Sequence, residues 1–230
     1  MPGPSRRRLA LAVPLCALAL AACGGGSSSG EGGDGAPAPA AANPGCARVA
    51  APKPRSEADL PRPTARLKAG ETAVAKVETS CGAFEITLDA KRAPLTGGSF
   101  ASLAREGFYD GLAFHRVVAG FVIQAGDPLG TGEGGPGYTI EEAPPGDLTY
   151  GKGVVAMAKT EPEPPGTSGS QFFVVTADDA QLPPDYSLLG RVTRGMDVVE
   201  RIGAVETDAG DVPVSPVVIR SIRIETEPAG

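Results

Sequence analysis

Between residues 72 and 226 the chain alternates short apolar runs with turns, and this rhythm limits the folds open to it. About eight runs rich in Val, Ile, Phe and Thr are separated by turns that contain Gly, Pro or Asp. Because no helix alternates regularly with the runs, a parallel βαβ sheet is disfavoured. The pattern predicts a single all-β barrel or sandwich with two helices packed on it. The expected strands lie at 73–79, 83–88, two within 113–127, 153–158, 171–176, 187–192 and 217–224.

Two segments have helical periodicity. Residues 96–106 space their apolar side chains at helical intervals, with Thr96 placed to cap the amino end and Gly107 placed just beyond the carboxyl end. Residues 195–202 bring Met196 and Ile202 to one face. These are the two helices expected to cover the β structure.

The amino terminus has the layout of an export signal. Arg6, Arg7 and Arg8 precede an apolar stretch at 9–20 that is too short to span a bilayer as a helix. The run Leu20-Ala21-Ala22-Cys23 resembles the lipobox of bacterial lipoproteins. The resemblance implies a signal peptide at 1–22, a lipid on Cys23 and a protein held at the outer face of the cell membrane. A plain secretory signal, with Cys23 unmodified, is the alternative.

The remaining cysteines are a pair. Cys16 leaves with the signal and Cys23 would be acylated, so Cys46 and Cys81 remain in an exported, oxidising setting. Paired cysteines in that setting tend to bridge. We expect a Cys46–Cys81 disulfide, with two unpaired buried thiols as the alternative.

Composition divides the rest of the chain. Residues 23–45 consist largely of Gly, Ser, Ala and Pro, which predicts a flexible tether. Residues 46–71 mix charged residues with Pro and Ala and are expected to form an extended lead-in. Residues 72–226 form the folded domain.

Several function classes are disfavoured. A net charge of −6 argues against nucleic-acid binding. One histidine in the whole chain, His115, leaves no Ser-His-Asp arrangement and no support for a metal site. The run GTGEGG within 130–138 fits a dinucleotide fingerprint, but Pro136 and Gly137 prevent the helix that such a site needs. A glycine-rich surface loop, with no cofactor, is the better interpretation. No oligomer signal is present, so we expect a monomer.

One arginine stands in an apolar stretch. Residues 113–127 read AFHRVVAGFVIQAGD, two short strands joined at Ala119-Gly120, and Arg116 is surrounded by Phe and Val. A guanidinium stays charged and is costly to bury unpaired. It is therefore expected either on an exposed edge strand or at the rim of an apolar cleft.

Several blocks together resemble the cyclophilin family of peptidyl-prolyl cis-trans isomerases, in the family's order. The resemblance implies a closed eight-stranded antiparallel barrel with two capping helices, and catalysis of X–Pro bond rotation without metal or cofactor. The blocks are FYDG at 108–111, FHRVV at 114–118, GFVIQ at 120–124 with GD at 126–127, VAMA at 155–158, GSQFF at 169–173 and LGRV at 189–192.

The resemblance also implies site residues. Arg116 would be the catalytic donor, since the reaction needs a hydrogen-bond donor for the twisted amide rather than a nucleophile. His115 is expected to be structural, because the reaction needs no base. The residues that would bind substrate are Phe121, Val122, Phe173 and Leu182 around the proline, Gln124 on its backbone, Ala158 and Lys159 along a strand edge, Gln171 behind Gln124, and Tyr186 where a histidine is common.

The sequence thus predicts an isomerase whose clients are Pro-containing segments of exported proteins. A non-catalytic module of the same fold, which binds or holds such segments without turnover, is the alternative. A small-ligand barrel is a weaker one, because small barrels are filled by their own side chains.

Overall fold

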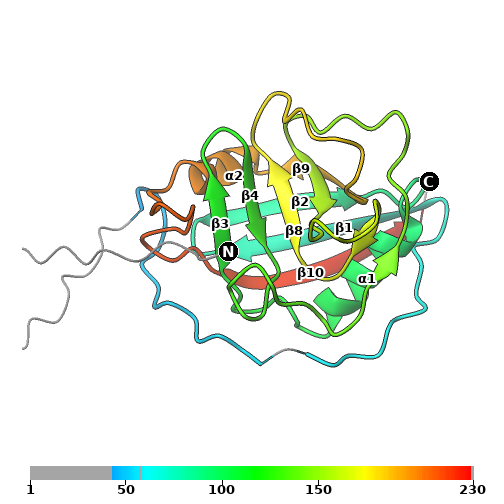
Figure 1. The fold of residues 1–230 in the computed structure, drawn as a ribbon, viewed down its shortest axis with the longest axis horizontal. Helices are drawn as coiled ribbons and strands as arrows, with labels where there is room; N and C mark the ends of the chain where they lie inside the picture. Colours follow the sequence, from blue (N-terminus) through cyan, green and yellow to red (C-terminus); the bar gives the residue numbers. More distant parts are fainter. Residues whose placement is uncertain (1–42, 57, 229–230) are drawn as a thin grey trace, which may run out of the picture. The chain divides into compact units, whose positions relative to one another are not determined.

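The described part of the protein is mostly β structure with two helices. The computed structural model describes residues 43–56 and 58–228, and its main sheet has eight antiparallel strands in the order β10-β1-β2-β9-β6-β8-β4-β3. This sheet curls into a half-barrel (Figure 1), and β5 pairs separately with β7. The elements are β1 Glu71–Thr79, β2 Gly82–Leu88, α1 Pro94–Arg105, β3 Phe114–Val118, β4 Val122–Ala125, β5 Ile140–Glu141, β6 Val154–Met157, β7 Thr167–Ser168, β8 Phe172–Val175, β9 Leu188–Arg194, α2 Met196–Gly203 and β10 Ile219–Pro228.

The expected closed barrel is wrong, because the two edge strands do not form a ladder. Within the described residues, Ala113 and Val218, directly before β3 and β10, form an isolated bridge, and no ladder continues from it along β3. Beyond a register shift next to Phe114, the backbone N–H of Val117 donates instead to the carbonyl oxygen of Asp211, at 2.8 Å. A loop therefore lies along β3 where β10 would be needed, and the sheet stays open.

Strand alternation gives the sheet two buried faces. On the inner face, Val117, Ile123 and Phe172 pack in the main core with Phe100 of α1 and Ile202 of α2. Their sequence neighbours on the central strands point to the opposite, outer face, because successive side chains of a strand alternate. A second apolar cluster has formed on that outer face, and its buried members are Ala93, Val122, Tyr150, Val154, Ala156, Phe173, Val175 and Leu188.

The amino end of α1 differs from the prediction. The helix begins at Pro94, whose fixed φ suits the first helical position, so Thr96 lies inside the first turn and is not the N-cap. The free backbone N–H groups of Leu95 and Thr96 donate to the carboxylate of Glu142, at 3.1 and 2.7 Å. Gly107 follows the helix with a left-handed φ of 70°, as predicted.

Residues 46–70, which we call the strap, run along the domain without forming a helix or strand in their described part. At one end Cys46 and Cys81 form a disulfide with an S–S distance of 2.07 Å, the pairing expected from the sequence. Near the other end Leu67 is buried in the main core, and its N–H donates to Pro94 O at 3.0 Å. The strap follows the lower edge of the domain in Figure 1, in blue to cyan.

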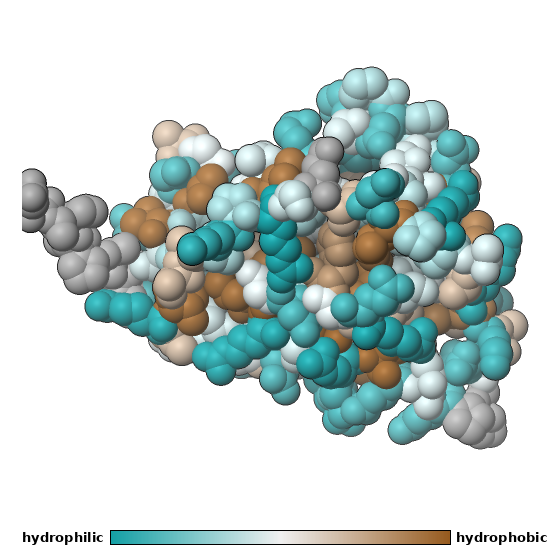
Figure 2. Space-filling model, turned by 90° about the horizontal axis from the view of Figure 1, so that it is seen from below, coloured by the Kyte–Doolittle hydropathy of each residue, from teal (hydrophilic) through white to brown (hydrophobic). Residues whose placement is uncertain are grey.

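The expected signal peptide at 1–22, the lipidated Cys23 and the tether as far as residue 42 lie outside the described residues. In the part that is described, no helix has the length and hydropathy that crossing a membrane requires. Seen from below, the described surface shows hydrophobic side chains in patches between hydrophilic ones (Figure 2).

Candidate active site

Four strands of the main sheet place four residues in one cross-strand row, and three of them are predicted site residues. Arg116 on β3 pairs with Gln124 on β4, Gln124 pairs with Phe173 on β8, and Phe173 pairs with Ala156 on β6. Cross-strand partners project from the same face of a sheet. The register therefore brings a cation, an amide and an aromatic ring together on the outer face, although they are far apart in sequence.

An apolar wall has formed around Phe173. The ring of Tyr186 meets it edge-on with centroids 5.3 Å apart, and the ring of Tyr150 lies at 6.4 Å. The structure brings all the residues predicted to surround a proline into this one cluster. The apolar wall consists of Phe121, Val122, Tyr150, Phe173, Leu182 and Tyr186.

The sequence prediction missed Tyr150, which holds the loop that carries Tyr186. The Tyr150 hydroxyl donates to the carbonyl oxygen of Tyr186 at 2.7 Å and accepts the N–H of Tyr186 at 3.1 Å. Burial raises the pKa of Tyr150 to about 12, so the hydroxyl stays protonated and can make both bonds. The only signal in the sequence was an aromatic residue directly before the glycine turn at 151–153.

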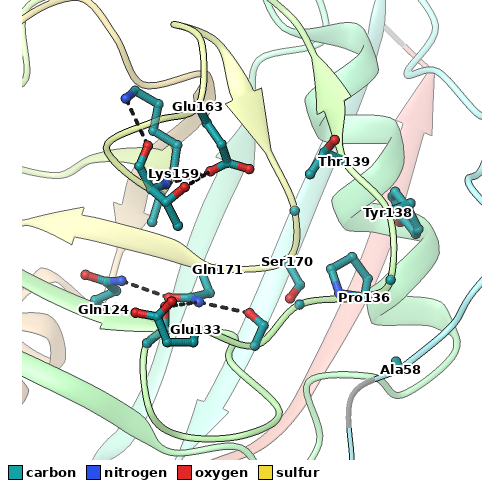
Figure 3. A pocket seen from close by; sticks show the side chains of 17 residues that line it. Ala58, Gln124, Glu133, Pro136, Tyr138, Thr139, Lys159, Glu163, Ser170 and Gln171 are labelled. Atoms are coloured by element: carbon teal, nitrogen blue, oxygen red, sulfur yellow. Dashed lines mark hydrogen bonds between the residues drawn. The ribbon is translucent and has the colours of Figure 1, made fainter.

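A polar wall lies beside the apolar one. The Gln171 amide nitrogen donates to the carbonyl oxygens of Gly132 and Gly134, at 2.8 and 2.9 Å, while its oxygen accepts the side-chain N–H of Gln124 at 2.9 Å. These three contacts orient Gln124 next to Arg116. We call Gln124, Gln171 and residues 132–137 the polar wall; they border a cavity of about 440 Å³ shown in Figure 3.

Asp127 sets the shape of the loop in the polar wall. Its carboxylate is buried, 1% exposed, and accepts the backbone N–H groups of Leu129, Thr131 and Gly132 at 2.7, 2.7 and 2.6 Å. Charged acceptors of this kind form strong hydrogen bonds, and three of them offset the cost of burying the charge. The sequence prediction missed this role, although an Asp before a glycine-rich run is a typical turn signal.

Arg116 lies on the edge strand and at the rim of the apolar wall at once. Its side chain is 41% exposed, and its Nε lies 3.4 Å from a carboxylate oxygen of Asp211. Asp211 has a left-handed φ of 63° and accepts the N–H of Val117 through its own carbonyl oxygen, so its loop is fixed to β3. With Nε facing Asp211, the terminal nitrogens of the guanidinium remain for another acceptor. No sequence pattern pointed to Asp211.

Two features connect Arg116 and Lys159 to Tyr186. Burial raises the pKa of the Tyr186 hydroxyl, and the nearby charge of Arg116 acts in the opposite direction. The Lys159 Nζ lies 5.9 Å above the centre of the Tyr186 ring. The N–H of Ala158 donates to Gln171 O at 2.9 Å, which joins the two walls at one strand edge.

His115 belongs to neither wall. It is buried, and both imidazole nitrogens lack a hydrogen-bond partner among the described residues. Burial lowers the pKa of the imidazole, and the negative charge of Asp127 partly opposes this shift. The side chain therefore stays neutral near pH 7. Across residues 43–56 and 58–228, no cluster of His, Cys, Asp and Glu has the arrangement of a metal site.

Comparison with known proteins assigns the family. The sequence model of the cyclophilin-type peptidyl-prolyl cis-trans isomerases matches residues 74–224. Human peptidyl-prolyl cis-trans isomerase-like 1 is 43% identical over 158 residues, which cover 67% of this chain and 91% of that protein. A peptidyl-prolyl cis-trans isomerase of Arabidopsis thaliana is 40% identical over 152 residues, covering 64% of this chain and 91% of the relative.

Solved structures agree. A crystal structure of a cyclophilin-type isomerase from Cryptosporidium parvum superposes with a TM-score of 0.64 at 28% identity, over 68% of this chain and 99% of that one. A second crystal structure of that protein, in the presence of the dipeptide Ala-Pro, gives a TM-score of 0.62 at 29% identity, over 66% of this chain and 98% of that one. With the family model, the relatives and the half-barrel in agreement, this chain belongs to the cyclophilin-type peptidyl-prolyl cis-trans isomerases.

Proposed function

We propose that Arg116 catalyses X–Pro rotation by donating a hydrogen bond to the twisted amide, while the apolar wall holds the proline ring. The observation that carries this proposal is the cross-strand row of Arg116, Gln124 and Phe173. It supports a donor, a backbone-binding amide and a hydrophobic platform on one face. This is the arrangement that a prolyl bond needs, with the ring on one side and its amide on the other.

The energetics suit a donor of this kind. Rotating a peptide bond breaks its partial double bond, with a barrier of roughly 18–20 kcal/mol. The twisted prolyl nitrogen becomes pyramidal and basic, so a charged donor binds that state better than either planar form. About 7 kcal/mol of such differential binding gives roughly a 10⁵-fold acceleration. One guanidinium aided by fixed packing can supply it without a covalent intermediate.

The other residues have binding roles in this proposal. Gln124, held by Gln171, binds the backbone of the segment before the proline, and the edge at Ala158 continues that contact. Tyr186 closes the pocket where a histidine is common in the family. The crystal structure of the Cryptosporidium relative with Ala-Pro supports an X–Pro segment as the ligand class.

The clients are proposed to be exported proteins. The Arg6–Arg8 run, the apolar stretch after it and Cys23 in a lipobox-like setting support export and a lipid anchor at the outer face of the membrane. The Cys46–Cys81 disulfide is consistent with an oxidising compartment. In this proposal a monomer is tethered by residues 23–45 and acts on Pro-containing chains as they fold.

Proline-limited refolding of a test protein examines the mechanism. Arg116→Ala should lower catalysis about 100-fold or more, the usual loss for one transition-state donor. Arg220→Ala is the matched control, because Arg220 is exposed on β10 and makes none of the described ion pairs. The mechanism is wrong if Arg116→Ala refolds the client as fast as the unaltered protein. An unaltered protein that binds Pro peptides but never accelerates refolding is instead a binding module.

A cell-fractionation experiment examines the anchor. Cys23→Ser should move the protein from the membrane fraction to the soluble exported fraction, because the thiol that carries the lipid is gone. Mass spectrometry of the amino-terminal peptide from the unaltered protein should show acylated Cys23. An unmodified Cys23 in a soluble exported protein would instead indicate a plain secretory signal.

A further inference from the structure

The strap is fixed at both ends, outside the part of the chain that matches the family. The family match begins at residue 74, whereas the strap spans 46–70. The Cys46–Cys81 disulfide fixes its start to the β1–β2 hairpin, and Leu67 fixes its end in the main core. A segment held at both ends has lost most of its freedom, so any contact it makes between them costs little extra ordering entropy.

The middle of the strap is clamped to the domain by Arg55. Its backbone N–H donates to Pro128 O at 2.9 Å. Its guanidinium donates to the carbonyl oxygen of Phe108 at 2.8 Å and also to that of Asp110. The clamp places the strap next to Pro128, just before the glycine-rich loop at 130–138 begins.

Directly after the clamp, the strap reaches the loop of the polar wall. The N–H of Leu60 donates to Pro136 O at 2.9 Å. The carbonyl oxygen of Ala58 lies so close to Gly137 that a Cβ atom there would collide with it. Ala58 itself lines the 440 Å³ cavity, on the side of the loop away from Gln124 (Figure 3).

These contacts complete a series that ends at Gln124 in the candidate site. Asp127 fixes the start of the loop and the strap fixes its far side at 136–137. Between them the carbonyl oxygens of Gly132 and Gly134 hold Gln171, which holds Gln124. We propose that the strap is a positioning element for substrate binding: it braces the polar wall, and so orients Gln124 toward the substrate backbone.

This inference rests on the proposed function, since it assigns the strap a part in binding Pro-containing chains. It also separates binding from catalysis. Arg116 is held by Asp211 and by β3, and neither belongs to the series that starts at the strap. Loosening the strap should therefore raise KM and leave kcat nearly unchanged.

Arg55→Gln in the full chain tests the clamp. We expect KM for a Pro-containing peptide to rise about fivefold, the size of one weakened hydrogen bond, with kcat within about twofold of the unaltered protein. Arg62→Gln is the matched control, because it makes the same chemical change on the same strap where no hydrogen bond or ion pair of the described residues is lost. Arg55→Lys, which keeps the charge but has one donor nitrogen in place of two, should recover part of the loss.

Gly137→Ala tests the close contact between Gly137 of the loop and Ala58 of the strap by changing the loop instead of the strap. The added Cβ should displace the loop from Ala58 and reproduce the KM increase. Gly130→Ala is its control, because Gly130 also has a positive φ but has open space around it. It carries the backbone strain in the same loop without touching the strap, so its KM should rise less than that of Gly137→Ala.

Hydrogen exchange of the loop amides provides a readout that needs no activity. In Arg55→Gln and Gly137→Ala, exchange at 132–137 should quicken about tenfold while the central strands stay protected. Unchanged exchange and unchanged KM in both variants would overturn the proposal. If the unaltered protein proves inactive, the proposed function fails; peptide Kd then replaces KM, and an unchanged Kd in the variants overturns the positioning role separately.

Discussion

The two walls of the candidate site are built by different means. The apolar wall is centred on Val122 of β4 and Phe173 of β8, and its other members pack against these two from neighbouring loops, so the position of its centre follows from the sheet. The polar wall depends on a loop without regular structure, shaped by Asp127 from within and by the strap from outside. The first is fixed by packing and the second by a short series of hydrogen bonds.

This difference separates stability from recognition. Side chains of the apolar wall contribute to the folded state through burial, so changing them alters both folding and substrate affinity. Gln124 and Gln171 of the polar wall are partly exposed and contribute less to folding, so changing them should act mainly on substrate binding. The predictions that follow test this division.

The largest effect is expected at Phe173. Phe173→Ala should lower the free energy of unfolding by about 3–5 kcal/mol, the usual cost of such a truncation, and should also abolish tight peptide binding. Denaturant unfolding and peptide titration measure the two losses. Because the alanine variant is close to the limit of folding, Phe173→Leu is the working variant for the affinity measurement.

Phe172→Leu is the contrast that sharpens this test. Phe172 points to the inner face, where its ring meets Phe100 and Tyr109 edge-on with centroids 5.6 and 5.8 Å apart. Phe172→Leu should lower the free energy of unfolding as much as Phe173→Leu does, while KM stays unchanged. Equal KM effects in the two variants would contradict the separation of the faces.

A smaller effect is expected at Asp211. Asp211→Gly removes the carboxylate beside Arg116 and keeps the left-handed backbone, which glycine adopts without strain. Since the guanidinium loses one of its two constraints, kcat should fall about tenfold. Stability should change by less than about 1 kcal/mol, because the pair is partly exposed. Asp211→Asn, which retains an acceptor and tolerates this φ, should recover most of kcat; equal losses in both variants would argue against a positioning role.

The smallest effect concerns His115 and pH. Burial lowers the pKa of this imidazole below its ordinary value of 6.5, so the unfolded chain takes up a proton before the folded one. Stability should therefore be full above pH 6.5 and should fall as pH drops from there through the folded pKa, by at most about 1.4 kcal/mol per pH unit. His115→Gln should remove this component from the stability profile. As the chain has one histidine, its NMR titration is unambiguous, and a midpoint above 6.5 would contradict the expectation.

Local pattern predicted much of the fold. Alternation and turns located all eight strands of the main sheet, and Gly107 was correctly placed beyond α1. Strand alternation also requires Phe172 and Phe173 to face opposite sides of the sheet, because it depends only on the backbone period. These features share a property: the residues that determine them are close together in the chain.

What the sequence did not predict depends on contacts between distant segments. The amino end of α1 is capped by Glu142, almost fifty residues beyond Pro94, and no local rule can find it. The open edge follows from a register shift in β3 and from the loop at Asp211. The strap was expected to be extended, but its place against Pro136 depends on a loop far along the chain.

The strap also has a consequence for the order of assembly. It is synthesised before the domain, yet the backbone groups that receive it belong to Pro94, Phe108, Pro128 and Pro136, all of which follow it in the chain. A chain emerging amino end first therefore carries an undocked strap until most of the sheet exists. Docking of the strap should be a late event in folding, so a protease that cleaves near Arg55 would distinguish newly synthesised chains from fully folded ones.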